Sequence, residues 1–73
     1  MEGEAKKKLP VLVTHWMEHN REHASEYETW ADRAKEEGLM EVSHALQEAA
    51  GIIQKTNENL LKAWESLKKA TKE

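Results

Sequence analysis

The residues best suited to bind a ligand form a histidine-rich segment in the first half of the chain. The pattern His-x-x-Glu occurs three times, at His15-Trp-Met-Glu18, His19-Asn-Arg-Glu22 and His23-Ala-Ser-Glu26. On a helix, side chains four residues apart lie one turn apart on one face, so two imidazoles can share a metal ion. A carboxylate three residues further on adds a third ligand. The spacing therefore predicts a metal site at His19, His23 and Glu26, with His15 and Glu22 as alternates.

Imidazole and carboxylate ligands with an open position suit Zn²⁺, Ni²⁺, Co²⁺ or non-haem Fe²⁺. The segment is not a metalloprotease motif, because Asn20 follows His19 where H-E-x-x-H would place a glutamate. This pattern favours metal handling or sensing over catalysis. A further Glu-x-x-His pair, Glu41 and His44, points away from the apolar pattern of its segment and is expected on the surface.

The segments that carry these residues are helical by their apolar periodicity. The first helix is expected at about 10–37 and the second at about 39–71, with Gly38 as a left-handed cap between them. Apolar or small residues recur at steps of three and four, and the predicted seam is Val13, Trp16, Asn20, His23, Tyr27, Trp30 and Ala34, then Leu39, Val42, Leu46, Ala49, Ile53, Thr56, Leu60, Ala63, Leu67 and Ala70. So short a connection predicts an all-α antiparallel hairpin. Residues 1–8 are expected to be a disordered lead-in to a single domain at 9–73.

A chain of 73 residues without cysteine has no disulfide to compensate for a small core. Apolar residues also flank the predicted seam, and a stripe that wide requires a second partner face. The economical arrangement is a homodimer in which two hairpins form a four-helix bundle, although a larger closed oligomer or an unidentified protein partner would also cover it. The residues expected in dimer or core packing are Trp16, Tyr27, Trp30, Ile53, Leu60 and Trp64.

Polar residues interrupt this core near the middle of the hairpin. Folding about Gly38 pairs residues equally distant from the turn, which sets Asn20 against Thr56, His19 against Asn57, and His23 against Ile53. A polar layer of this kind also fits a metal-free assembly or adaptor module, in which the histidines only specify register. Two copies of His23 would also suit axial ligation of noncovalent haem. Haem is disfavoured, because tryptophans at helical spacing usually form core.

Composition excludes several other classes. The net charge of −3 disfavours nucleic acid as a partner, and no segment has the ~18 consecutive apolar residues of a membrane span. We find no Gly-rich phosphate loop and no nucleophile–base arrangement, so the sequence favours a non-enzymatic protein. No secretory signal pattern precedes the helices, and a cytoplasmic location is expected.

From Leu9 to Ala24 the sequence LPVLVTHWMEHNREHA, followed by Trp30-Ala31 and Gly38-Leu39, resembles a group of short prokaryotic helical proteins. The shared element is an H-W-x-x-H-N-x-x-H core, and the likeness extends over roughly residues 9–70. The resemblance implies a helical hairpin, either standing alone or appended to another domain, and implies no substrate.

Overall fold

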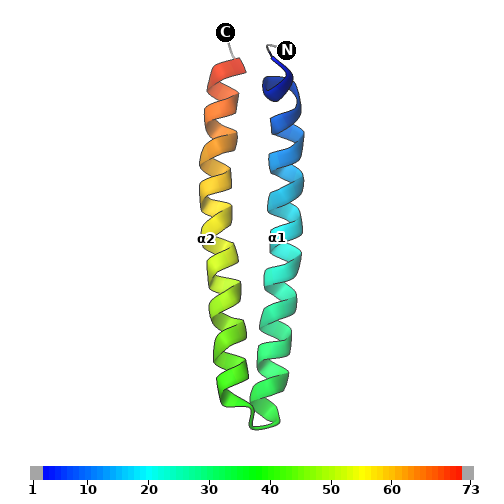
Figure 1. The fold of residues 1–73 in the computed structure, drawn as a ribbon, viewed down its shortest axis with the longest axis vertical. Coiled ribbons are helices and arrows are strands. Elements are labelled where there is room, and N and C mark those ends of the chain that lie inside the picture. Colours follow the sequence, from blue (N-terminus) through cyan, green and yellow to red (C-terminus); the bar gives the residue numbers. More distant parts are fainter. Residues whose placement is uncertain (1–2, 72–73) are drawn as a thin grey trace.

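Two long helices account for nearly all of the described chain. The computed structural model describes residues 3–71, with α1 at Glu4–Glu36 and α2 at Met40–Thr71. The helices run antiparallel side by side, and the two ends of the chain lie together at the end opposite the turn (Figure 1). The hairpin measures 55 × 16 × 15 Å, and no strand occurs within residues 3–71. The predicted all-α hairpin is confirmed.

The first helix begins six residues before the expected start. Residues 4–8, assigned from the sequence to a disordered lead-in, lie inside α1, where Lys8 Nζ pairs with Glu4 Oε2 at 3.0 Å. Residues 1 and 2 of that lead-in are outside the described range. Pro10 consequently lies in the helix interior and not in its first turn, where it removes one N–H donor from the helical ladder.

The turn between the helices is a Schellman motif. The N–H of Leu39 donates to the carbonyl of Ala34 at 2.8 Å, and that of Gly38 donates to Lys35 at 3.0 Å. Gly38 has φ +83°, the left-handed conformation that an L side chain disfavours. The glycine cap expected from the sequence is therefore confirmed.

Two alanine substitutions are expected to change stability in opposite directions. A Cβ at Gly38 or at Gly51 meets nothing within 4 Å, so neither substitution creates a clash. Gly38→Ala forces alanine into the left-handed region and should lower the free energy of unfolding by about 1–2 kcal/mol. Gly51→Ala, inside α2, should raise it by about 1 kcal/mol. Urea unfolding followed by circular dichroism measures both, and equal effects would contradict this account of the turn.

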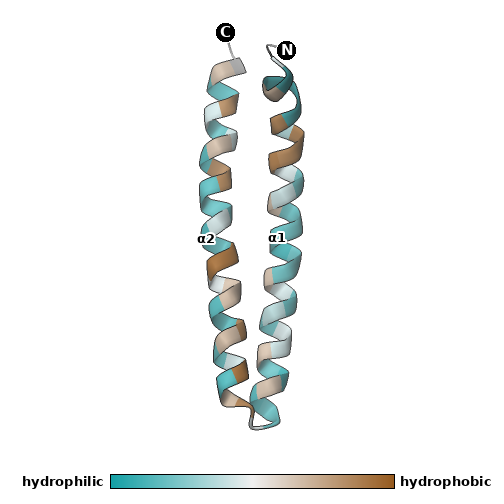
Figure 2. Cartoon of the chain, in the orientation of Figure 1, coloured by the Kyte–Doolittle hydropathy of each residue, from teal (hydrophilic) through white to brown (hydrophobic). Residues whose placement is uncertain are grey.

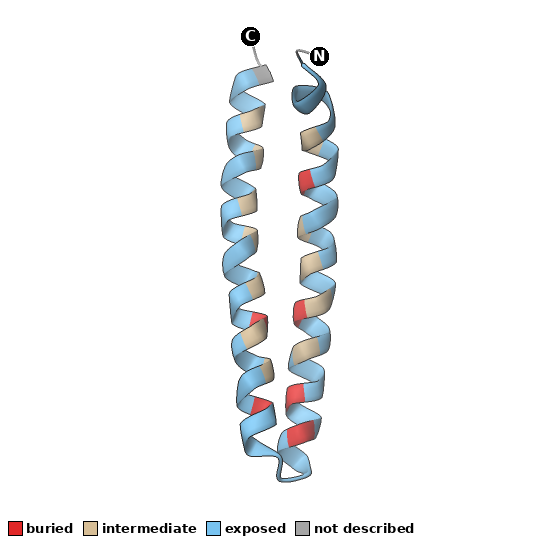
Figure 3. Cartoon of the chain, viewed as in Figure 1, coloured by how far each residue is buried: buried red, intermediate tan, exposed pale blue. Residues whose placement is uncertain are grey.

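The most deeply buried residues of the seam between the helices are small. Buried and half-buried positions follow the facing sides of α1 and α2 (Figure 3), while hydrophilic residues cover most of the rest of both helices (Figure 2). The fully buried residues are Val13, Ala24, Ala31, Ala34, Ser43 and Ala50. The half-buried residues are Leu9, Pro10, Met17, Asn20, His23, Tyr27, Leu46, Ala49, Ile53, Asn57, Leu60, Trp64 and Leu67. Small side chains at the contact let the two backbones approach closely.

The seam differs from the predicted one at Leu39, which precedes α2 and is exposed, and at every second predicted position of each helix. The sequence placed Trp16, His23 and Trp30 of the first helix in it, and Val42, Ala49, Thr56 and Ala63 of the second. In the structure the more buried residue is the following one each time: Met17, Ala24 and Ala31, then Ser43, Ala50, Asn57 and Trp64. His23 and Ala49 are half-buried at the edge of the seam, and the predicted Ala70 is exposed. The small Ala31 takes the place expected for Trp30, whereas the large Trp64 takes the place expected for Ala63, so side-chain size alone does not decide which residue enters the seam. The Oγ of Ser43 is buried without a hydrogen-bond partner, so its small size explains its position better than its polarity does.

Candidate functional site

Two imidazoles converge on the surface of α1, one turn apart. The Nε2 atoms of His19 and His23 are 3.1 Å apart, and the two rings meet edge to face with centroids at 4.5 Å. Two nitrogen ligands on one tetrahedral Zn²⁺, each ~2.0–2.1 Å from the ion, are about 3.3–3.4 Å apart. The pair thus lies within a few tenths of an ångström of the spacing that a shared metal ion requires.

Glu26 contacts the other side of the His23 ring. Its Oε1 lies 3.2 Å from Nδ1 of His23, and a carboxylate only accepts hydrogen bonds. His23 therefore donates from Nδ1, which leaves the lone pair on Nε2 directed toward His19. A carboxylate that orients a ligating histidine through its second nitrogen is a recurrent feature of metal sites. Within one chain Glu26 is placed to orient His23, and does not face the point between the two Nε2 atoms.

The alternate ligands do not join this pair. The ring of His15 stacks on His19 with centroids 6.2 Å apart, and His15 and Glu22 are both exposed. No group of three or more histidine, aspartate or glutamate side chains within the described residues could hold a metal ion. The single chain brings together two of the predicted ligands and their orienting carboxylate, and no complete set of three.

A polar layer crosses the seam beside the histidines, with a composition different from the predicted one. Asn20 Nδ2 donates to Asn57 Oδ1 at 3.0 Å, and Asn57 Nδ2 donates to the Met17 carbonyl at 3.0 Å. Thr56, predicted to face Asn20, is exposed and donates to the Ile52 carbonyl of its own helix. The predicted pairing was one residue out of register, because the turn is centred between Gly38 and Leu39 and not on Gly38.

The two flanks of the hairpin differ in character. Residues that follow seam positions lie on one flank, where Gln54 Nε2 donates to Glu28 Oε2 across the helices at 3.4 Å. Residues that precede seam positions lie on the opposite flank, which includes Trp16 and Trp30, 42% and 58% exposed. We call this second flank the Trp–His face; its residues are Leu12, Trp16, His19, His23 and Trp30 of α1 with Val42, Ala45, Ala49, Ile52 and Thr56 of α2.

The residues expected in core or dimer packing divide between these regions. Tyr27, Ile53, Leu60 and Trp64 are half-buried at seam positions. Trp16 and Trp30 belong to the Trp–His face, and the Arg33 guanidinium lies 5.0 Å from the centre of the Trp30 ring. The aromatic side chains outside the seam thus lie on the same flank as the paired histidines.

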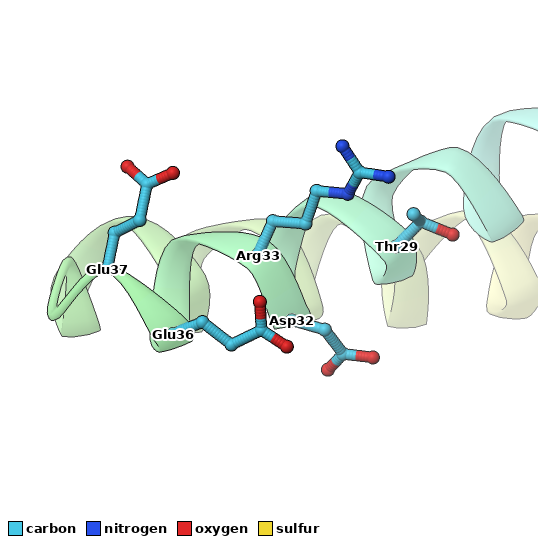
Figure 4. Close-up of a pocket in the computed structure, with 5 residues that line it drawn as sticks. All are labelled: Thr29, Asp32, Arg33, Glu36 and Glu37. Atoms are coloured by element: carbon cyan, nitrogen blue, oxygen red, sulfur yellow. The ribbon is translucent and has the colours of Figure 1, made fainter.

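A shallow hollow near the turn offers a weaker site. It is lined by Thr29, Asp32, Arg33 and Glu36 from the end of α1 and by Glu37, the residue after it, and all five are exposed. Figure 4 shows the Arg33 and Glu37 side chains extending to one side, and those of Asp32 and Glu36 to the other. Side chains that diverge in this way do not surround a ligand. The histidine pair is therefore the candidate site.

Comparison with known proteins places the hairpin in a family without a stated activity. A family model described as "Domain of unknown function (DUF8180)" matches residues 9–71. An uncharacterised protein of Archaeoglobus fulgidus is 39% identical over 56 residues, which cover 77% of this chain and 89% of the archaeal protein. No solved structure matches. Within residues 3–71, neither helix is long and apolar enough to cross a membrane.

Proposed function

The chain belongs to the family described as Domain of unknown function (DUF8180), and from that premise we propose that it is a small non-enzymatic protein that binds a divalent transition metal. The observation that carries the proposal is the 3.1 Å separation of the His19 and His23 Nε2 atoms. Imidazole nitrogen suits Zn²⁺, Ni²⁺, Co²⁺ and Fe²⁺. The role we propose is metal handling or sensing in the cytoplasm.

The orientation of His23 supports this proposal. In the metal-free chain the His19 Nε2–H donates to His23 Nε2, while Glu26 accepts from Nδ1. A cation held between the two Nε2 atoms would need the lone pair of each, so the His19 proton would move from Nε2 to Nδ1, where the neutral ring keeps it. Glu26 then keeps the His23 ring in its ligating orientation and adds negative charge next to the site.

Removal of either histidine is expected to weaken metal binding strongly. Isothermal titration of the untagged protein with Zn²⁺, Ni²⁺ and Co²⁺ should show binding tighter than micromolar. His19→Ala or His23→Ala should weaken it at least about 100-fold, because one imidazole alone is a poor site. Glu26→Gln should weaken it about 10–100-fold, as loss of an orienting partner does.

The matched control is His44→Ala, which removes an exposed histidine of α2 away from the pair. We expect its affinity to equal that of the unaltered protein. Absence of binding tighter than micromolar in the unaltered protein would refute the proposal. Equal affinity in His19→Ala and His44→Ala would move the site elsewhere.

The second candidate function is a metal-free assembly module that binds further copies of itself. It is favoured by the Trp–His face, which exposes large apolar side chains along one flank of both helices. In this alternative the Asn20–Asn57 pair specifies register and the histidines bind nothing. It predicts the same melting temperature with and without a chelator, whereas the metal-binding proposal predicts a lower one with it.

A further inference from the structure

The histidine pair is an incomplete site within one chain. It supplies two nitrogen ligands, whereas zinc sites in proteins have three or four protein ligands. No third ligand group is gathered there by the described residues. Because the pair lies on an exposed face, a second molecule that packs there can supply the remaining metal ligands.

The position of the pair along the hairpin suits a second copy of this chain. The Asn20–Asn57 bond sets the register, and His23 is level with the middle of α2. The midpoint between His19 and His23 is level with residue 21, and Leu12 and Trp30 lie nine residues to either side of it, about 14 Å along the helix. A twofold axis perpendicular to the helices at this midpoint joins the two histidine pairs and sets Leu12 of one copy beside Trp30 of the other.

The exposed area of the single hairpin is large for its mass. The chain exposes 6004 Å², whereas a compact monomer of 8.4 kDa exposes about 4,600 Å². The excess, about 1,400 Å², is more than the ~800 Å² that each partner contributes to a standard interface. Covering the Trp–His face with a second copy would remove this excess.

Charge selects the antiparallel orientation of the two hairpins. At the open end, residues 3–12 and 60–70 contain six lysines and two glutamates, while the turn end, residues 28–48, contains six acidic residues and two basic ones. An antiparallel pair sets the basic end of each copy against the acidic end of the other. A parallel pair would set like charges together.

We propose that two copies pack through their Trp–His faces in antiparallel orientation, and that one metal ion is held between them by His19 and His23 of both copies. This inference rests on the proposed function, because it uses the same imidazoles. It adds that the binding unit is the dimer and that the ion has four nitrogen ligands, a complete tetrahedral set for Zn²⁺. Metal binding then stabilises the dimer, and dimerisation strengthens metal binding.

Stoichiometry separates the two proposals. Native mass spectrometry of the untagged protein with Zn²⁺ should show twice the chain mass with one ion, and His23→Ala should lose the ion. One ion on each monomer would overturn the shared site and leave the proposed function standing. A chain that binds no ion under any condition would overturn both.

Spin labels test the orientation. Glu36→Cys places one label near the turn in a chain that otherwise has no cysteine, fifteen residues from the level midway between His19 and His23. The antiparallel dimer should give a label–label distance of about 45 Å along the bundle. Pulsed electron resonance showing a separation of about 20 Å would overturn the antiparallel arrangement, because only a parallel pair brings both turns together.

Discussion

Replacing Trp16 and Trp30 together with serine should convert the dimer into a monomer. These side chains are 42% and 58% exposed in the single hairpin. The substitutions therefore remove more apolar contact area from a dimer interface than from the seam between the two helices. Buried interface tryptophans often contribute 2 kcal/mol or more each, and symmetry counts each residue twice. We expect the dissociation constant to rise at least about 1,000-fold, which corresponds to about 4 kcal/mol. Sedimentation equilibrium measures it.

The same experiment has a matched control on the other flank. Val11→Ser with Leu61→Ser removes two exposed apolar side chains that lie away from the Trp–His face. Tryptophan, valine and serine have similar helix propensities, so helix stability itself changes little, apart from the small penalty at Leu61. The control should remain dimeric. Equal dissociation of the two double variants would place the interface elsewhere, and a monomeric unaltered protein would exclude this dimer.

Asn57→Leu should destabilise the hairpin by about 2 kcal/mol. The substitution removes two hydrogen bonds, one to Asn20 and one to the Met17 carbonyl, and leaves the half-buried Asn20 amide against a leucine. An unpaired buried polar group costs ~1–3 kcal/mol. For a domain of this size the melting temperature should fall by about 8–16 °C, and calorimetry at a fixed chain concentration measures the change.

The double variant Asn20→Leu/Asn57→Leu tests the cause of that loss. It replaces both amides with apolar groups, so stability should return to that of the unaltered protein or exceed it. Gln47→Leu, at an exposed position of α2 on the flank opposite the Trp–His face, is the single control and should shift the melting temperature by less than about 3 °C. A double variant less stable than Asn57→Leu would show that the two amides stabilise the hairpin by more than satisfying each other's hydrogen-bonding groups.

The helices and the turn could be predicted because their signals are local. Steps of three and four residues specify a helix wherever they occur, and Gly38 followed by Leu39 has the pattern of a left-handed cap. The pairing of His19 with His23 is equally local, since residues four apart on one helix always lie one turn apart. The start of α1 was misplaced because Pro10 is typical of a first turn.

The rotation of the seam could not be read from the pattern. Apolar or small residues occupy both members of the pairs Trp16–Met17 and Ala49–Ala50, so periodicity favours neither choice. Side-chain size does not decide between them either, since Ala31 enters the seam in place of Trp30 but Trp64 in place of Ala63. The rotation of each helix is decided for the helix as a whole when the two helices pack. The register was out by one residue for a related reason, since the geometry of the turn determines which residues lie level with one another.

The sequence by itself determined two helices, their cap and an adjacent pair of imidazoles, because each depends on contacts within a few residues. Only the tertiary structure decided which side chains enter the seam, that Asn20 meets Asn57, and that Glu26 orients His23 without completing a three-ligand set. These outcomes depend on how closely two helices approach and on the rotamers that their contacts leave available. Contacts between residues that are far apart in the sequence therefore determined that the Trp–His face lies outside the seam.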